Sequence, residues 1–336
     1  CNMGGDGNWK NGGVGSLYCA NVDFIVSGCR FIENHAARGG VFQASGQMIT
    51  NCYFKGNTSS DGPTCLFNPQ GAASVDGNYL RVLDCVFEDN TVGAGGQLYN
   101  GRSARFIGCA FRRCGRNGGG LFAFNYYSVV QNCLFEDNYG SVSLGCSGDC
   151  PFVWSDLVIR NSNAGSSSAL ALPNGPVERV TVVGCTCGKA ISGNMPRIRN
   201  FLVVSNTCSD TAVYTQDGLA GNAYYWESGT IVANTANNAI YIVANAQQDG
   251  VTNIVRNCVA WGNRKTSGVA STIAVGPKHK VVFFTHCDTD PPVAAAYDDG
   301  TCFSENPKFF NPFRTGDVRL RQDSPLIGAG LLQDWM

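Results

Sequence analysis

A short phrase recurs along this chain: a cysteine, a short apolar stretch and, usually five residues after the cysteine, an asparagine. The cysteines of the five clearest copies are 23, 33, 24 and 24 residues apart. A period in the twenties, built from β-type runs and Gly/Asn turns, is typical of solenoids in which each repeat forms one coil. The five copies are SGCRFIEN (27–34), TNCYFKGN (50–57), LDCVFEDN (83–90), IGCAFRRC (107–114) and QNCLFEDN (131–138).

Weaker copies extend the repeat along nearly the whole chain. In WSDLVIRN (154–161) we place Asp156 in the cysteine slot, and in VGCTCGKA (183–190) Ala190 replaces the asparagine. Phe201 and Gly229 take the cysteine slot in IRNFLVVSN (198–206) and ESGTIVAN (227–234). VRNCVAWGN (255–263) is intact, and FFTHCDTD (283–290) is the last copy, which gives about ten coils. The predicted asparagine ladder is Asn34, Asn57, Asn90, Asn138, Asn161, Asn206, Asn234 and Asn263.

A second run follows each asparagine and is also strand-like. Both runs are rich in β-branched and aromatic residues and are bounded by Gly, Asn, Pro and Ser. No stretch shows a sustained helical period with caps, so we expect almost no helix. Short strands that pair in parallel with their copies in the next coil describe an all-β, single-stranded parallel β-helix. The second runs are GGVFQAS (39–45), GGQLYNG (95–101), GGLFAFN (119–125), ALALPNG (169–175), AVYTQDG (212–218), AIYIVAN (239–245) and STIAVGP (271–277).

The repeated residues have structural interpretations. The cysteines are expected to point inward as a column of small thiols, with a column of disulfides as the alternative. The asparagines are expected to form an inward ladder at a tight turn, with left-handed backbone at the asparagine itself. The spacing of the 17 cysteines does not predict a zinc site. The best local disulfide is Cys146–Cys150, and Cys287–Cys302 is a second choice.

Charge and hydropathy exclude several partners. The chain has 24 basic and 25 acidic residues and a net charge of −1, so we expect no nucleic acid partner. No apolar run is long enough to span a bilayer, so the protein is not expected to be membrane-spanning. The opening CNMGGDGNW reads as the middle of an earlier coil, so we expect a segment of a longer protein; a lipid-modified Cys1 is the alternative.

Two family resemblances follow from these motifs. The F-x-x-N and glycine-pair repeats, as in FIEN…GGV (31–41) and FEDN…GGQ (87–97), resemble those of chlamydial polymorphic outer-membrane proteins. They also resemble bacterial right-handed parallel β-helix proteins with pectate-lyase-like folds. The tail ENPKFFNPFRTGDVRLRQDSPLIGAG (305–330) is similar to the ending of many secreted bacterial β-helices. The resemblance implies a right-handed β-helix over 1–290, a closing segment over 291–336 packed on the last coils, and export to the extracellular space or the bacterial cell surface.

The loops after the second run suggest a groove, and several of them carry aromatic residues. Exposed rings beside polar groups suit the faces of sugars; the alternative is that these rings stack on loops and cover the coil ends. The candidate substrate-binding residues are Phe124, Tyr126, Tyr127, Tyr224, Tyr225 and Trp226.

Catalysis in this groove would need other side chains. A glycoside hydrolase needs two carboxylates, which Asp217, Glu227 and Asp249 could supply. A lyase or epimerase needs a base and a cation; the candidates are Lys278, His279 and His286. An exposed basic turn is the other interpretation of that cluster, and we expect no cofactor and no metal.

Two main hypotheses remain. The favoured one is a secreted or cell-surface, adhesin-like or passenger-like β-helix that binds glycans or other surfaces without turnover. The alternative is a polysaccharide-processing enzyme, namely a lyase, epimerase or glycoside hydrolase, acting in a groove along one parallel sheet. A spacer or stalk is a third role.

Overall fold

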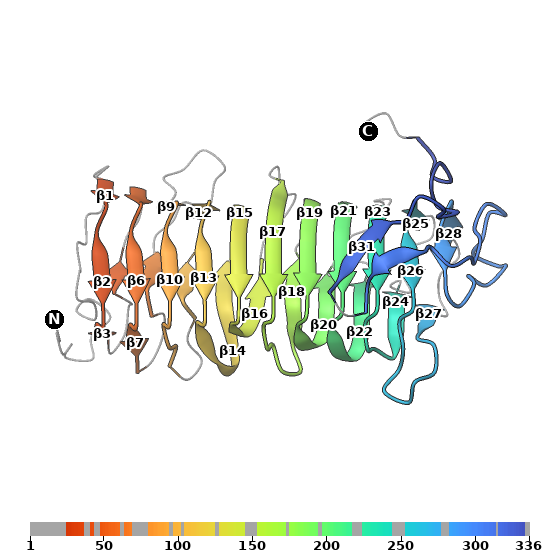
Figure 1. Cartoon of the computed structure of the whole chain (residues 1–336). Helices are drawn as coiled ribbons and strands as arrows, with labels where there is room; N and C mark the ends of the chain where they lie inside the picture. The colour runs from red at the N-terminus through yellow and green to blue at the C-terminus, as the bar shows by residue number, and fades with distance from the viewer. Residues whose placement is uncertain are drawn as a thin grey trace.

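The chain folds into a right-handed parallel β-solenoid, as the repeat predicts. The coils stack from one end of the molecule to the other in sequence order (Figure 1). There is no helix among the described residues. The computed structural model describes residues 25–36, 41–43, 48–60, 64–68, 80–93, 97–101, 104–124, 128–144, 153–172, 175–193, 197–216, 224–243, 253–276, 282–313 and 315–332.

Two parallel sheets form the walls, and the strands of each sheet come from corresponding places in successive coils. Each second run that falls on described residues supplies a strand of the smaller sheet, as predicted. The large sheet contains β1 (Ile25–Ser27), β2 (Arg30–Ile32), β5 (Met48–Thr50), β6 (Tyr53–Lys55), β9 (Leu80–Leu83), β10 (Val86–Glu88), β12 (Ala104–Ile107), β13 (Ala110–Arg112), β15 (Val129–Glu136), β17 (Trp154–Arg160), β19 (Pro176–Val183), β21 (Arg197–Val204), β23 (Tyr224–Val232), β25 (Asn253–Arg256), β26 (Val259–Trp261), β28 (Val282–Thr285) and β29 (Asp288–Thr289). The second sheet contains β4 (Phe42–Gln43), β8 (Leu66–Asn68), β11 (Tyr99–Gly101), β14 (Gly115–Phe124), β16 (Tyr139–Ser143), β18 (Ser168–Leu172), β20 (Thr186–Gly193), β22 (Thr207–Gln216), β24 (Asn238–Val243) and β27 (Thr272–Val275). Two small pairs complete the fold: β3 (His35–Ala36) with β7 (Thr58–Ser59), and β30 (Phe309–Asn311) with β31 (Asp317–Leu320).

The cysteine column is real and lies inside the solenoid. The thiol of Cys85 donates to the carbonyl of Leu83 at 3.2 Å, and its sulfur accepts the backbone N–H of Cys52 at 3.4 Å. Every described cysteine is a free thiol. Cys287 and Cys302, the second-choice disulfide pair, are both free thiols. Cys146 and Cys150, the first-choice disulfide pair, lie outside the described residues, so that prediction stays a prediction.

A stack of phenylalanine rings runs beside the cysteines and fills the core. Phe54 and Phe87 lie 4.7 Å apart between ring centroids, as do Phe87 and Phe111, and the rings are nearly parallel. Phe31 and Phe135 extend the stack at either end, at 4.8 and 4.9 Å. This spacing is that of neighbouring strands, so one ring from each coil stacks on the next.

The inward asparagine ladder is confirmed. The Asn234 amide oxygen accepts both the backbone N–H and the side-chain amide of Asn206, each at 2.9 Å. Its amide nitrogen donates to the carbonyl of Val203 and to the Asn263 oxygen, also at 2.9 Å. The ladder continues through Cys114, Ser162 and Cys185, which occupy the same column.

Three details of the repeat alignment were wrong. Leu157, not Asp156, pairs with Cys133 and therefore holds the cysteine slot. Ser162, not Asn161, is in the ladder, and Cys185 lies in the ladder instead of the cysteine column. The left-handed backbone also sits one residue earlier than predicted, on the residue that precedes the ladder or the cysteine. Non-glycine examples are Glu33, Asp89 and Ser205 before the ladder, and Asn51, Asp84 and Asn132 before the cysteine.

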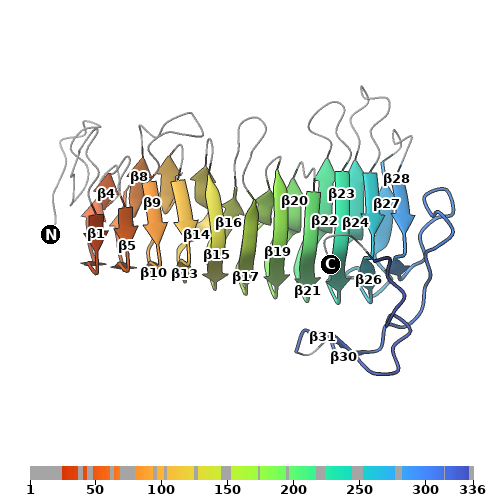
Figure 2. The same ribbon diagram turned by 90° about the horizontal axis from the view of Figure 1, so that it is seen from above.

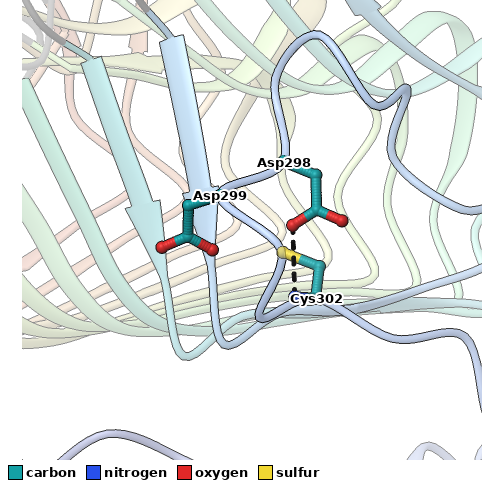
Figure 3. Close-up of side chains that lie close together, drawn as sticks. All are labelled: Asp298, Asp299 and Cys302. Atoms are coloured by element: carbon teal, nitrogen blue, oxygen red, sulfur yellow. Dashed lines mark hydrogen bonds between the residues drawn. The ribbon is translucent and has the colours of Figure 1, made fainter.

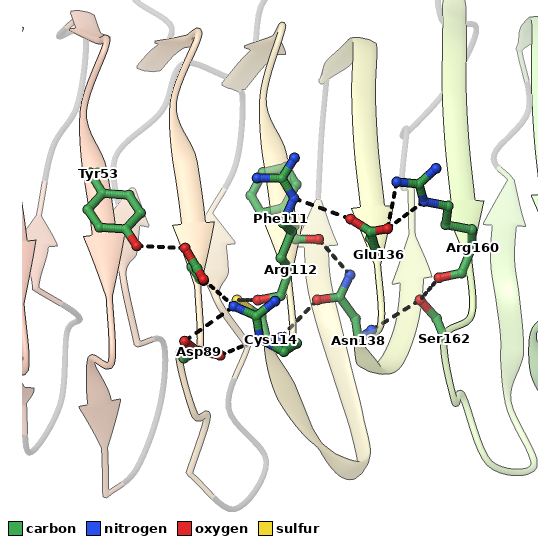
Figure 4. A network of polar contacts seen from close by, with 11 residues as sticks. Tyr53, Asp89, Phe111, Arg112, Cys114, Glu136, Asn138, Arg160 and Ser162 are labelled. Carbon is green, nitrogen blue, oxygen red and sulfur yellow. Dashed lines mark hydrogen bonds and ion pairs between the residues drawn. The ribbon is translucent and has the colours of Figure 1, made fainter.

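The outer wall of the large sheet changes character along the solenoid. One outward row carries alternating charges: Lys55, Glu88, Arg112, Glu136 and Arg160 are register neighbours. Arg160 and Arg112 bind Glu136 from either side, at 2.6 and 3.3 Å (Figure 4). The Tyr53 hydroxyl donates to Glu88 at 2.6 Å. In the following coils the same row becomes Val183, Val204 and Val232.

The carboxyl-terminal segment covers this apolar part of the wall. Val204 and Val232 point outward from the coil, yet they are buried. The Ser205 hydroxyl donates to the carbonyl of Pro312 at 3.3 Å, and the Asn257 amide exchanges two hydrogen bonds with the backbone of Leu331. Figures 1 and 2 show the β30–β31 hairpin outside the stack, beside strands of the large sheet. The boundary at 290 between coils and closing segment stays a prediction.

Candidate functional site

The outer face of the second sheet carries two neighbouring tyrosines. Tyr214 on β22 pairs in register with Tyr241 on β24, and their rings meet edge to face with centroids 5.8 Å apart. Both are half-buried. The same outward row holds Ala171 and Ser192 on one side and Ala274 on the other. Because these neighbours are small, the two rings are the largest groups of this part of the row.

Polar groups surround the tyrosine pair. The ammonium of Lys189 lies 5.0 Å from the centroid of the Tyr214 ring and 2.9 Å from a carboxylate oxygen of Asp210. The Tyr214 hydroxyl donates to the amide oxygen of Gln216 at 3.2 Å. Burial raises the pKa of Tyr214 although Lys189 opposes the shift, so the phenol keeps its proton at neutral pH. The face thus combines ring surface with fixed hydrogen-bonding groups, and we call it the tyrosine face.

The tyrosine face lies at the base of two loops that were expected to form the groove. β22 ends at Gln216, directly before the loop with Asp217, and β24 ends at Val243, before the loop with Asp249. The tyrosines themselves escaped the prediction, which looked only at loops. Tyr214 and Tyr241 occupy the same position in successive copies of the second run, AVYTQ and AIYIV, and that coincidence could have identified them.

Many of the predicted site residues fall outside the described part of the chain. Phe124 and Tyr224 are described by their backbone alone, at the end of β14 and the start of β23. For the remaining undescribed candidates the predictions stay predictions. They are Asp217, Asp249, Lys278, His279, Tyr126 and Tyr127.

Glu227 is described, and its surroundings are those of a wall ion pair. The side chain is fully buried, with 0% exposure, among three arginines. Its Oε2 lies 2.8 Å from Nε of Arg199 and 3.4 Å from Nη2 of Arg197. Its Oε1 is bound by Arg256 on the next coil. A glycosidase acid or nucleophile must reach its substrate, and this carboxylate is covered and engaged on both oxygens.

The two neighbouring aromatic candidates divide between wall and core. Trp226 is only 2% exposed and meets Phe201 edge to face, with ring centroids 6.2 Å apart. It therefore packs inside the coil and does not line a groove. Tyr225 points outward, and the guanidinium of Arg256 lies 5.6 Å from its ring centroid. This cation–π contact ties Tyr225 to the Glu227 cluster.

His286 lies at a turn of the large sheet, directly after Thr285, which pairs in register with Arg256. Its backbone is left-handed, with φ of 49°, directly before the inward Cys287. Its Nδ1 is 2.9 Å from the Thr285 hydroxyl. The side chain lines a pocket beneath the carboxyl-terminal segment.

One group of described side chains brings metal-ligating atoms together. The ligand atoms of Asp298, Asp299 and Cys302 lie within 4.8 Å of one another (Figure 3). However, one oxygen of Asp298 accepts the backbone N–H groups of Gly300 and Cys302, at 2.9 and 3.2 Å. Desolvation raises the pKa of Asp298, but these hydrogen bonds outweigh it and leave the pKa below its usual value. The cluster organises its own loop by such bonds, so it does not by itself constitute a metal site.

Comparison with known proteins supplies no family: neither the protein-family models nor the curated proteins contain a match to this chain. Within the described residues, no helix has the length and apolar character needed to cross a membrane.

Proposed function

We propose that this protein is an exported, surface-acting β-helix that binds glycans on the tyrosine face. The observation that carries the proposal is the register pair of Tyr214 and Tyr241, flanked by the Lys189–Asp210 ion pair. Sugar rings offer apolar C–H patches between fixed hydroxyls, so they suit aromatic rings beside hydrogen-bonding side chains. The successive coils extend the face in one direction, which fits a linear polymer better than a single sugar.

The bacterial, secreted, adhesin-like character of the protein belongs to the same proposal. It rests on the repeat and tail motifs that resemble pectate-lyase-like β-helices and polymorphic outer-membrane proteins. The fold itself hosts both binding proteins and enzymes, so it does not decide between them.

The enzymatic alternative is weaker because one of the three candidate carboxylates of a hydrolase is already held in ion pairs. Glu227 has no exposed surface and binds Arg197, Arg199 and Arg256. A hydrolase acting on the same polymer would need its pair from Asp217 and Asp249. Binding without turnover requires neither, so we favour it.

Affinity electrophoresis through gels that contain acidic or neutral polysaccharides tests the proposal. We expect retardation by at least one polymer and a loss of about thirtyfold in affinity for the double variant Tyr214→Ala/Tyr241→Ala, since each of the two ring contacts contributes about 1 kcal/mol. Tyr139→Ala is the matched control, because Tyr139 is an exposed tyrosine on the same sheet. Retardation that the double variant leaves unchanged would refute the tyrosine face as the binding site. Unsaturated uronates or new reducing ends in the same incubations would instead establish the enzyme.

A further inference from the structure

A pocket of about 320 Å³ lies between the large sheet and the carboxyl-terminal segment. One wall is the outer surface of the last coils, with Thr230, Val259 and Asp288 in one register row. The turn residues Asn257 and His286 stand beside that row. Phe303 extends that row through a β-bridge with Asp288. The opposite wall is apolar and comes from the closing segment: Phe309, Val318, Leu320, Leu326 and Ala329.

Asp288 is the unusual member of this lining. The residue is only 1% exposed, and its Oδ1 accepts a hydrogen bond from the backbone N–H of Glu305 at 2.9 Å. Its Oδ2 is buried and has no hydrogen-bond partner among the described residues. A buried carboxylate oxygen without a donor is costly, and such unpaired groups concentrate at functional sites.

The other polar groups of the pocket do not supply the missing donor in the structure. The Asn257 amide is occupied by both backbone groups of Leu331, at 2.7 and 2.8 Å. No lysine or arginine is among the described lining residues, and nearby Arg264 pairs with Asp290 at 3.2 Å. Burial raises the pKa of Asp288 to about 6, and the carboxylates of Glu305 and Asp290 act in the same direction. The pocket is therefore apolar on one side and acidic at one point on the other.

We propose that this pocket binds a small organic amine, with its apolar ring or chain against the closing segment and its ammonium on Asp288. An ammonium group would donate to the unpartnered Oδ2 and neutralise the buried charge at the same time. Phe309 and the leucines of the opposite wall would cover the apolar body of the ligand. This site lies on the large sheet, so it is independent of the glycan binding proposed for the second sheet.

The proposal is tested by isothermal titration of the full chain with 2-phenylethylamine as the probe. Two controls keep the ring and change the head group: 2-phenylethanol is neutral and 3-phenylpropionate is acidic. At about pH 8, where an Asp288 carboxyl of raised pKa is ionised, we expect the amine to bind at least about tenfold more tightly than the alcohol, and the acid to bind least.

Variants then locate the binding. Asp288→Asn keeps the shape and is expected to abolish the preference for the amine. Asp290→Asn removes a carboxylate that lies outside the lining and acts on Asp288 only through its charge, so this variant is expected to keep the preference for the amine over the alcohol. Leu320→Trp fills the pocket from the opposite wall with Asp288 intact, so it tests the site even where Asp288→Asn fails to fold. Equal binding of amine and alcohol, unchanged binding in Asp288→Asn or Leu320→Trp, or no binding of any probe at millimolar concentration would overturn the proposal.

Discussion

The asparagine ladder makes a quantitative prediction at Asn234. This residue is 1% exposed, lies between Asn206 and Asn263, and uses its whole side chain in the ladder. Its amide oxygen accepts two hydrogen bonds from Asn206, and its amide nitrogen donates one to Val203 and one to Asn263. Asn234→Ala removes all of these bonds and leaves the backbone N–H of Asn206 buried without its acceptor.

The expected loss follows from these contacts. Each hydrogen bond contributes about 1 kcal/mol net, so removing the bonds made by the Asn234 side chain lowers the free energy of unfolding by about 4 kcal/mol. Asn234→Ser is expected to lose about half as much. Ser162 shows how a serine serves in this column, because its hydroxyl accepts the backbone N–H of Asn138 at 3.2 Å.

Urea unfolding followed by circular dichroism measures the difference, and Asn161 provides the matched control. Asn161 is exposed, lies beside the ladder and has φ of 52°, a conformation that glycine adopts without strain. Asn161→Gly is therefore expected to change the free energy of unfolding by less than about 0.5 kcal/mol. Equal effects at Asn234 and Asn161, or a loss below about 1.5 kcal/mol for Asn234→Ala, would refute the account of the ladder.

Two further predictions concern buried carboxylates. Glu227→Gln leaves three arginines around a neutral amide and is expected to lower the free energy of unfolding by about 3–5 kcal/mol, measured by thermal or urea unfolding. Glu178→Gln changes a partly exposed side chain and should lower it by less than about 1 kcal/mol. Similar losses for both variants would contradict the buried-cluster interpretation. The pKa of Asp288 in the folded protein is raised from 3.8 to about 6, so the native state binds more protons than the unfolded state in that pH interval. The resulting contribution to the free energy of unfolding is fully present below about pH 4 and is lost as the pH rises through about 6. Asp288→Asn should remove this pH dependence and raise the free energy of unfolding at neutral pH by at most about 3 kcal/mol. Urea titrations at a series of pH values check this expectation, and an unchanged pH dependence would count against it.

The repeat phrase was sufficient to predict the fold and most of the columns, and its failures have a physical cause. Asparagine and aspartate suit two adjacent positions: the ladder, and the left-handed residue just before it or before the cysteine. Where a copy had lost its cysteine, as in WSDLVIRN, the pattern could slip by one residue. Asp156, with φ of 58°, is thus a turn residue, and Leu157 is the inward one. Residues such as Arg179 and His286 take the same left-handed conformation without any compositional signal.

The candidate sites were less accessible to sequence reasoning. The tyrosine face depends on the register between β22 and β24, which an alignment of the second runs could have supplied. The burial of Asp288 depends instead on where the tail folds back, because Glu305 and the apolar wall reach it from outside the coil. Ion pairing at Glu227 likewise needs Arg199 and Arg256, which are close only through the stacking of coils. Such long-range contacts have no signature in a single copy of the repeat.

The two walls of the solenoid differ in how the closing segment contacts them. Hydrogen bonds join the closing segment to the large sheet, among them those at Ser205, Asn257 and Asp288, and the neighbouring Val204 is buried there. No described hydrogen bond joins that segment to the tyrosine face on the second sheet. The tail shields the apolar row of the large sheet from solvent, and no described hydrogen bond holds it on the tyrosine face. That division is why we assign polymer binding to the second sheet and small-molecule binding to the covered pocket.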